Sequence, residues 1–255
     1  MDAFMSGLTP TVFLLALGVG FVAGVVKGMV GFAMPMVMIS GLSSLISPEL
    51  ALAGLLLSTV AANAQQALRQ GLDEAWASVK SFKVFLIVGG VMLLLAAQMV
   101  SVIPAHVLLL VIGLAVSLFT ALQLIGFSPE LRERSPKVEG VVAAVAGMIG
   151  GVSGIWGPPT VMYLSALDVE KRDSLRIQGV IYGLGAVLLV VSHIGSGVLN
   201  ARTWPFSAIM LVPALIGMQL GFRFHDRIDQ KSFKRLTQIV LFVAGLNLIR
   251  RGLMG

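Results

Sequence analysis

The sequence contains no cysteine among its 255 residues. Disulfides, thiolate metal sites and cysteine nucleophiles are therefore excluded. Charged side chains are also scarce, because they make up 12% of the chain, about half the share that is usual in soluble proteins. Hydrophobic residues reach 57%, and the mean hydropathy is +0.95. A soluble globule of this size cannot bury so much apolar surface, so the composition predicts an integral membrane protein.

Several classes of function lack their sequence signals. The net charge of +6 is not arranged as a basic stripe interleaved with aromatic residues, so we expect no nucleic-acid partner. The sequence has no HExxH motif, no Walker loop and no dinucleotide fingerprint, and we expect neither a cofactor nor enzymatic activity. The apolar stretches are continuous over about 20 residues rather than alternating over about 10, which predicts membrane helices instead of a barrel.

Ten apolar segments are separated by charged residues, Pro or Gly. Two neighbouring pairs are unusual, because a Gly-rich stretch that ends in Pro joins the two members of each pair. Several of these members are too short to cross about 30 Å of hydrocarbon as straight helices, so we expect helices broken inside the membrane. The segments are 10–27 and 31–46 (the first broken pair), 49–68, 79–99, 104–126, 139–152 and 156–167 (the second broken pair), 174–194, 204–222 and 232–250.

The distribution of Lys and Arg predicts how these segments are oriented. If ten segments alternate between the two sides of a membrane, 14 of the 18 basic residues fall on one face. Arg202, Arg250 and Arg251 fall on the other face, and Lys27 lies within the membrane. Because Lys and Arg concentrate in cytoplasmic loops, we expect a protein of the bacterial inner membrane with both termini periplasmic or extracellular.

An internal repeat occurs at an offset of 123 residues. Residues 22–35 (VAGVVKGMVGFAMP) align with residues 145–158 (VAGMIGGVSGIWGP), and six of the 14 positions are identical. An odd number of crossings in each half inverts the second half, so we predict an all-α membrane protein of two inverted-topology repeats. Each repeat has a Gly/Pro-broken helix pair and three transmembrane helices. The N-terminal repeat is 1–126, a cytoplasmic linker is 127–138 and the C-terminal repeat is 139–255.

Inverted repeats with interrupted helices indicate a secondary transporter that works by alternating access. Its substrate site is expected near the bilayer midplane, where the two breaks meet. Pro35 and Pro158 end the breaks and leave helix ends whose N–H groups can face an anion. Gly24, Gly28 and Gly31 share one helical face and are expected to allow close approach of a neighbouring backbone.

The two Gly-rich motifs that end at Pro35 and Pro158 resemble those of the sulfite exporter TauE/SafE family. The run from Pro213 to Gly221 and the following basic turn and apolar segment are similar to the final two helices of that family. The resemblance covers nearly the whole chain. It implies an exporter of small sulfur-containing anions such as sulfite, sulfoacetate or other organosulfonates. Lys27 and Phe32 depart from the family, because glycines are more typical at these two positions.

The candidate site residues lie at the breaks and on the third segment. Lys27 is charged inside an apolar stretch, at a cost on the order of 3 kcal/mol, and either attracts an anionic substrate or snorkels to the interface. The amides of Asn63 and Gln66 either bind sulfonate oxygens or link helices. Trp156 either lines the path or sits in the interfacial belt. The predicted substrate-binding residues are Lys27, Gly28, Gly31, Asn63, Gln66, Gly151, Ser153, Gly154 and Trp156.

Two alternative functions are left open by the sequence. An intramembrane serine hydrolase would use Ser153 of a GxSG string with His193, and a channel for small anions would need a polar ring from an oligomer. His193 is alternatively the carrier of a coupled proton, and Arg176 either attracts anions or only follows the charge rule. The run from His225 to Arg235 is predicted to be a solvated cytoplasmic turn. The expected partners are a small anion, a coupled proton and the lipid bilayer, while the oligomeric state is unknown.

Overall fold

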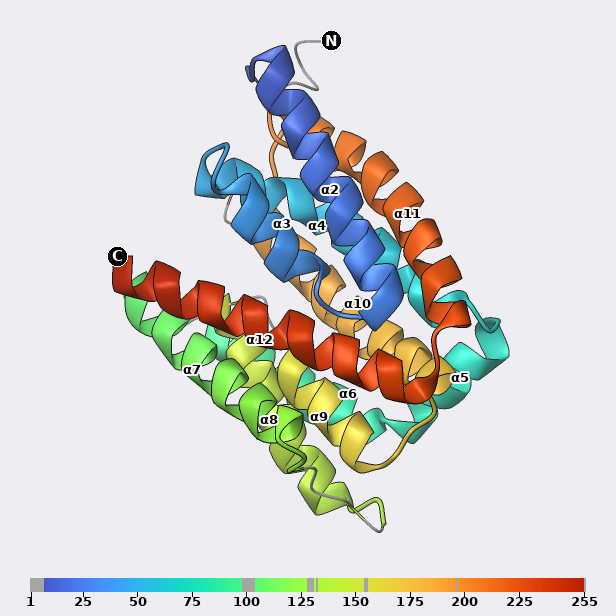
Figure 1. Ribbon diagram of the computed structural model, residues 1–255. Helices are drawn as coiled ribbons and strands as arrows, with labels where there is room; N and C mark the ends of the chain where they lie inside the picture. Colours follow the sequence, from blue (N-terminus) through green and yellow to red (C-terminus); the bar gives the residue numbers. More distant parts are fainter. Residues whose placement is uncertain are drawn as a thin grey trace.

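The computed structural model describes residues 7–97, 104–127, 131, 133–153, 156–195 and 197–254, and within these ranges it contains helices and no strand. The predicted all-α class is therefore confirmed for the described residues. The helices, shown in Figure 1, are α2 (Pro10–Val30), α3 (Met34–Leu42), α4 (Pro48–Leu68), α5 (Leu72–Ser81), α6 (Lys83–Ala97), α7 (Ala105–Leu124), α8 (Pro136–Ser153), α9 (Gly157–Ala166), α10 (Lys171–Gly195), α11 (Trp204–Arg227) and α12 (Gln230–Met254).

The predicted segments correspond to these helices with one correction. Segment 79–99 is wrong at its start, because helix α5 begins at Leu72 and the chain bends by 73° before α6. Helix α5 carries Asp73, Glu74 and Lys80, so it is amphipathic and was not part of a continuous apolar run. Five described helices (α2, α4, α10, α11 and α12) are long and apolar enough to cross a membrane, and the bent pair α5–α6 is a sixth candidate.

The first predicted break is formed by local signals. Helix α2 ends at Gly31, which has φ of 93° and donates its N–H to the carbonyl of Lys27 at 2.7 Å. This left-handed conformation is accessible to Gly without steric cost, so the chain turns sharply here. Helix α3 then starts with Pro35 in its first turn, where the missing N–H of Pro is not needed. The second break lies between the end of α8 and the start of α9.

Small residues bring three helix pairs into backbone contact. A Cβ on Gly24 or Gly28 of α2 would overlap the backbone of α11, and Gly217 and Gly221 of α11 face α2 in the same way. Gly147 similarly brings α8 against α6. The predicted close approach is confirmed for Gly24 and Gly28, and this type of packing stabilises helix pairs in lipid, where the hydrophobic effect between helices is weak.

Gly31 does not share these neighbours. A Cβ there would meet the side chains of Leu175 and Gln178 on α10, so the prediction that Gly31 acts on the same face as Gly24 and Gly28 is wrong. The reason is that α2 ends at Gly31, which places this residue beside α10 instead of α11. Gly113 of α7 and Gly245 of α12 make the third close helix contact.

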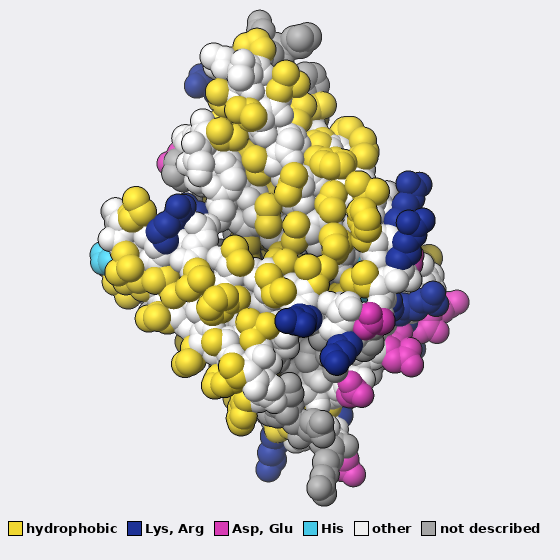
Figure 2. All heavy atoms as spheres, in the orientation of Figure 1, with side chains coloured by type: hydrophobic (Ala, Val, Ile, Leu, Met, Phe, Trp, Pro, Cys, Tyr) yellow, Lys and Arg dark blue, Asp and Glu magenta, His cyan; other side chains and the backbone are white. Residues whose placement is uncertain are grey.

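The outer surface is predominantly apolar. Val22, Ile216 and Val243, on α2, α11 and α12, have exposed fractions of 52%, 58% and 61%. Figure 2 shows hydrophobic side chains spread across the face formed by these helices, with Lys and Arg gathered at its edge near α5. An apolar surface of this extent, bordered by basic side chains, is typical of a protein surrounded by lipid.

Candidate functional site

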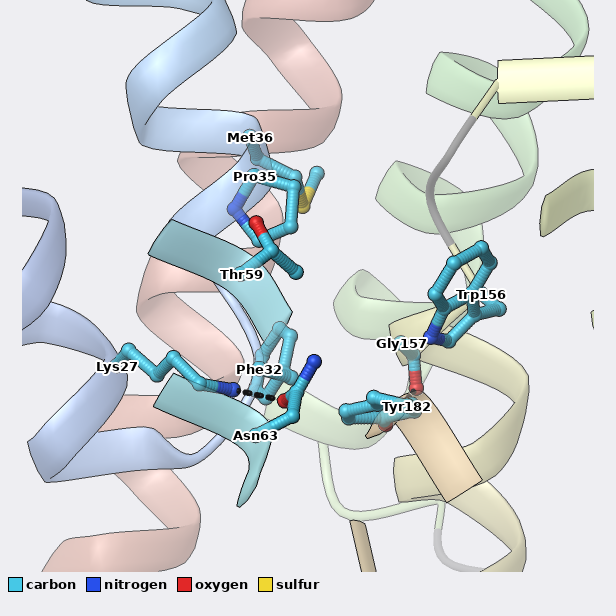
Figure 3. A pocket seen from close by; sticks show the side chains of 9 residues that line it. All are labelled: Lys27, Phe32, Pro35, Met36, Thr59, Asn63, Trp156, Gly157 and Tyr182. Atoms are coloured by element: carbon cyan, nitrogen blue, oxygen red, sulfur yellow. Dashed lines mark hydrogen bonds between the residues drawn. The ribbon is translucent and has the colours of Figure 1, made fainter. Parts of the chain in front are cut away.

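A small cavity lies between the two helix breaks, and we call it the central cavity (Figure 3). Its volume is about 20 Å³, which leaves room for little more than one water molecule. Residues from both breaks and from the two long helices α4 and α10 form its wall. They are Lys27, Phe32, Pro35, Met36, Thr59, Asn63, Trp156, Gly157 and Tyr182.

Lys27 is the charged residue of the central cavity, and its side chain is 1% exposed. Its Nζ donates hydrogen bonds to Oδ1 of Asn63 at 2.6 Å and to the carbonyl of Gly31 at 3.2 Å. The ammonium also lies 5.9 Å from the centre of the Tyr182 ring. Among the described residues no carboxylate forms an ion pair with Lys27. Within the described ranges, Nζ of Lys27 therefore contacts neutral oxygens and an aromatic ring.

Asn63 offers a second donor at the same place. Its Oδ1 is occupied by Lys27, while its buried Nδ2 has no hydrogen-bond partner among the described residues. In Figure 3 this nitrogen points away from Lys27 and toward the space between Thr59 and Trp156. A buried donor without a partner costs free energy on the order of 1–3 kcal/mol, so a ligand oxygen at this position would be favourable.

Trp156 forms the wall on the side of the second break. A Cβ on Gly150 or on Gly185 would collide with its indole ring, so the ring occupies a slot between α8 and α10. The ring centre lies 6.4 Å from that of Tyr182, whose hydroxyl donates to the carbonyl of Gly157 at 3.2 Å. Trp156 also borders a second, apolar cavity between α6, α8 and α10, so it separates two spaces.

Four of the predicted site residues are brought together, because the carbonyl of Gly31 accepts a hydrogen bond from Lys27 beside the three residues that line the cavity. Lys27, Asn63 and Trp156 line the central cavity. Gly28 faces Gly221 of α11, and Gly151 is buried in the last turn of α8. Gly154 and the side chain of Ser153 lie outside the described residues, so the pairing of Ser153 with His193 required by the hydrolase alternative is not tested.

Gln66 lies one helical turn beyond Asn63 on α4 and borders a different cavity. It is fully buried, and its Nε2 donates to the carbonyl of Leu175 on α10 at 2.6 Å. This second cavity lies at the end of α4, and we call it the arginine vestibule. Its volume is about 170 Å³. The vestibule is lined by Gln66, Arg69, Gln70, Arg172, Leu175, Arg176 and Asp226.

The run from His225 to Arg235 is not the predicted solvated turn, because His225 lies on α11, residues from Gln230 onward belong to α12, and only 228–229 lie between the two helices. His225 is fully buried rather than solvated, with Nδ1 3.2 Å from the carbonyl of Met29 and its ring edge-on to Phe233. Its position on the inner side of α11 could not be read from the charges around it. Asp229 is exposed, and the pKa of its carboxyl lies below the ordinary value because Ser232 donates two hydrogen bonds to it.

Thr59 and Tyr182 both line the central cavity, although neither was predicted from the sequence to be a site residue. The signal was present, because these residues are separated by the repeat offset of 123 and occupy equivalent positions on α4 and α10. Phe32, Pro35 and Gly157 also line the wall and were noted only as parts of the two motifs, while Met36 follows the first motif and was not noted.

A helical bundle with an apolar outer surface and a buried, cation-bearing cavity between two broken helices has the features of a membrane transporter. The family model described as Sulfite exporter TauE/SafE matches residues 16–248. The chain therefore belongs to the sulfite exporter TauE/SafE family, as its motifs indicated, and is a membrane transport protein. Searches of curated proteins and of solved structures found no match.

Proposed function

We propose that this protein is a secondary transporter that exports small sulfur-containing anions, such as sulfite or organosulfonates, by alternating access. The observation that carries the proposal is the buried ammonium of Lys27 beside the unpartnered amide of Asn63. Together they offer charge and a hydrogen-bond donor to one oxyanion. Membership of the TauE/SafE family supports this class of substrate.

The charge of Lys27 favours an anion over a neutral or cationic solute. A buried ammonium without a carboxylate partner is costly, and a bound anion offsets that cost through a charge-assisted hydrogen bond. The neutral amide of Asn63 adds a donor without a second charge, so the site is matched to one or two negative charges. A substrate oxygen that accepts from Nζ of Lys27 and from Nδ2 of Asn63 would leave the apolar part of an organosulfonate toward Trp156.

The central cavity is narrow in this structure, which supports alternating access rather than an open channel. A space of about 20 Å³ is too small for sulfite together with its waters, so helices must separate before substrate enters. The first break can act as a hinge, because Gly31 turns the chain at the end of α2 and Pro35 lies in the first turn of α3. We propose that the second break, with Gly151, Ser153 and Gly154, moves against the first and contributes backbone donors.

The packing of the helices supports two repeats related by a twofold axis. When the bent pair α5–α6 is counted as one element, the first helix of each half packs on the fourth helix of the other, since α2 packs on α11 and α8 packs on α6. The third helices, α4 and α10, pack on each other, and so do the fifth helices, α7 and α12. Such an exchange is expected when an axis relates the halves, and with an odd number of crossings per half the repeats are inverted.

Helix boundaries support the same relationship. The ends of α2 and α8, the starts of α3 and α9, and the starts of α4 and α10 are each separated by the repeat offset of 123 residues. In Figure 1 the start of α2 and the end of α12 both lie on the side away from α5. We propose that the basic side near α5 is cytoplasmic and that the opposite side is periplasmic or extracellular.

Export is favoured by the membrane potential. An anion that leaves a cell with a negative interior gains about 2.3 kcal/mol per charge for each 100 mV. Coupling of anion export to the movement of a proton is also part of the proposal.

The proposal is tested by flux measurements in proteoliposomes that contain the purified protein. Sulfite and sulfoacetate are expected to move, whereas zwitterionic taurine is expected to move poorly because its ammonium opposes Lys27. Lys27→Met keeps most of the length of the side chain and removes its charge, so it is expected to abolish the flux. Absence of any anion flux, or full flux in Lys27→Met, would contradict the proposed function.

A further inference from the structure

The arginine vestibule is a second polar space that the central site does not use. It lies where the end of α4 meets the start of α10, and it brings three guanidinium groups and one carboxylate to one cavity. Its volume of about 170 Å³ compares with about 20 Å³ for the central cavity, so it can hold an oxyanion with water around it.

We propose that the arginine vestibule is an anion-binding site that recruits the transported oxyanion from the basic face, and that Gln66 with Leu175 is the closed gate above it. This inference rests on the proposed transport function. It adds a binding site that is separate from Lys27 and assigns it to one side of the protein.

A polar seam along α4 and α10 joins the two cavities. Asn63 and Gln66 follow one another at helical spacing on α4 and so face the same neighbour, and Gln70 lies in the turn directly after this helix. Asn63 reaches the central cavity, Gln66 and Gln70 reach the vestibule, and α10 covers the seam along its length. On α10 Gln178 is 1% exposed, and its buried Oε1 has no partner among the described residues.

The seam is shut at Gln66. Its Nε2 donates to the carbonyl of Leu175, while its buried Oε1 is left without a partner in the described structure. A Cβ on Gly179 would collide with the backbone of Ala67, so α4 and α10 touch directly beside this point. Because only one of its two polar groups is bonded, the Gln66 amide can exchange Leu175 for another hydrogen-bond partner. Separation of α4 from α10 would then open a path between the two cavities that is lined by side-chain amides.

Two of the three vestibule arginines are paired with carboxylates, and the third is left for an anion. Arg69 forms an ion pair with Asp226 at 2.6 Å, and Arg176 is fixed by Asp173 at 3.0 Å and by Glu74 at 3.4 Å. Arg172 lines the same cavity and makes no hydrogen bond or ion pair to any residue that the structure describes. Its guanidinium is therefore the group that is free to bind a substrate oxygen.

The test compares three variants in proteoliposomes made only of zwitterionic lipid, with sulfite supplied to the basic face. The chain has no cysteine, so a cysteine placed at the exposed Arg227 in every protein reports orientation through an impermeant maleimide. Arg172→Gln is expected to raise the KM for sulfite about three-fold at low salt, with less effect at high salt. Asp226→Asn removes the opposing carboxylate and is expected to lower the KM.

Arg223→Gln is the matched control, because it removes the same charge from an exposed position outside the vestibule. It is expected to leave the KM unchanged. An unchanged KM in Arg172→Gln, or an equal rise in Arg223→Gln, would overturn the vestibule. A rise that occurs only when anionic lipid is added would overturn it as well, because the cavity would then bind a headgroup.

The same experiment separates this inference from the proposed function. If the wild-type protein moves sulfite and Lys27→Met does not, the transport function stands whatever Arg172→Gln does. If the wild-type protein moves no sulfite, both the function and the vestibule fail.

Discussion

The Nζ of Lys27 lies 2.6 Å from Oδ1 of Asn63, and this contact joins helix α2 to helix α4 beside the first helix break. It also sets the direction of the Asn63 amide, because an oxygen held by an ammonium leaves the Nδ2 donor to face the cavity. In the proposed function the two residues act as one unit, in which the charge of Lys27 attracts an anion and the oriented amide of Asn63 binds it.

Loss of the Lys27 charge is expected to stop transport without unfolding the protein. Lys27→Met should lower the sulfite flux at least ten-fold, since a hydrogen bond to a charged group contributes about 1.5–3 kcal/mol. Its melting temperature in detergent should not fall, because the substitution also removes the cost of a buried charge. Lys83→Met, at the start of α6 and outside the cavity, is the control and should transport normally. Normal flux in Lys27→Met would remove this residue from the site.

The position of the Trp156 ring is expected to control whether the central cavity can open. Gly185→Ala places a methyl group against the indole and should push it toward the cavity, which lowers the maximal flux and shifts the tryptophan fluorescence. Gly195→Ala is a matched control on the same helix, because a Cβ there meets no atom within 4 Å. Equal flux in the two variants would show that the slot around Trp156 is not used in transport.

Contact between α2 and α11 is expected to depend on the absence of a side chain at Gly28. Gly28→Ala should destabilise the protein by about 1–3 kcal/mol, because the added methyl overlaps the backbone of Met218 and Gly221. Thermal unfolding in detergent measures this loss. Gly18→Ala, on the same helix and with nothing within 4 Å, should unfold like the wild type or slightly later. A stable Gly28→Ala variant would mean that the two helices separate easily.

The parts of the fold that were predictable from sequence depend on local signals. The break after Val30 follows from Gly31 and Pro35, which act through their own backbone, and the apolar runs give the long helices. The Lys27–Asn63 pair was not predictable as a contact, although both residues were named, because 36 residues separate them. Helix α5 was missed because its charges interrupt the apolar run. The burial of His225 depends on Met29, which is distant in sequence, and on Phe233, which the next helix brings back against it.

A cysteine at Gln66 is expected to report the opening of the gate between α4 and α10. In the closed structure this position is fully buried, so an impermeant maleimide added from the basic face should label Gln66→Cys slowly. Sulfite should change the labelling rate several-fold if the seam opens during the transport cycle, whereas labelling of a cysteine at Arg227 should not respond. Adding Lys27→Met should abolish the response to sulfite, because the anion can no longer occupy the central cavity. A labelling rate that sulfite does not alter would show that the substrate does not pass between Gln66 and Leu175.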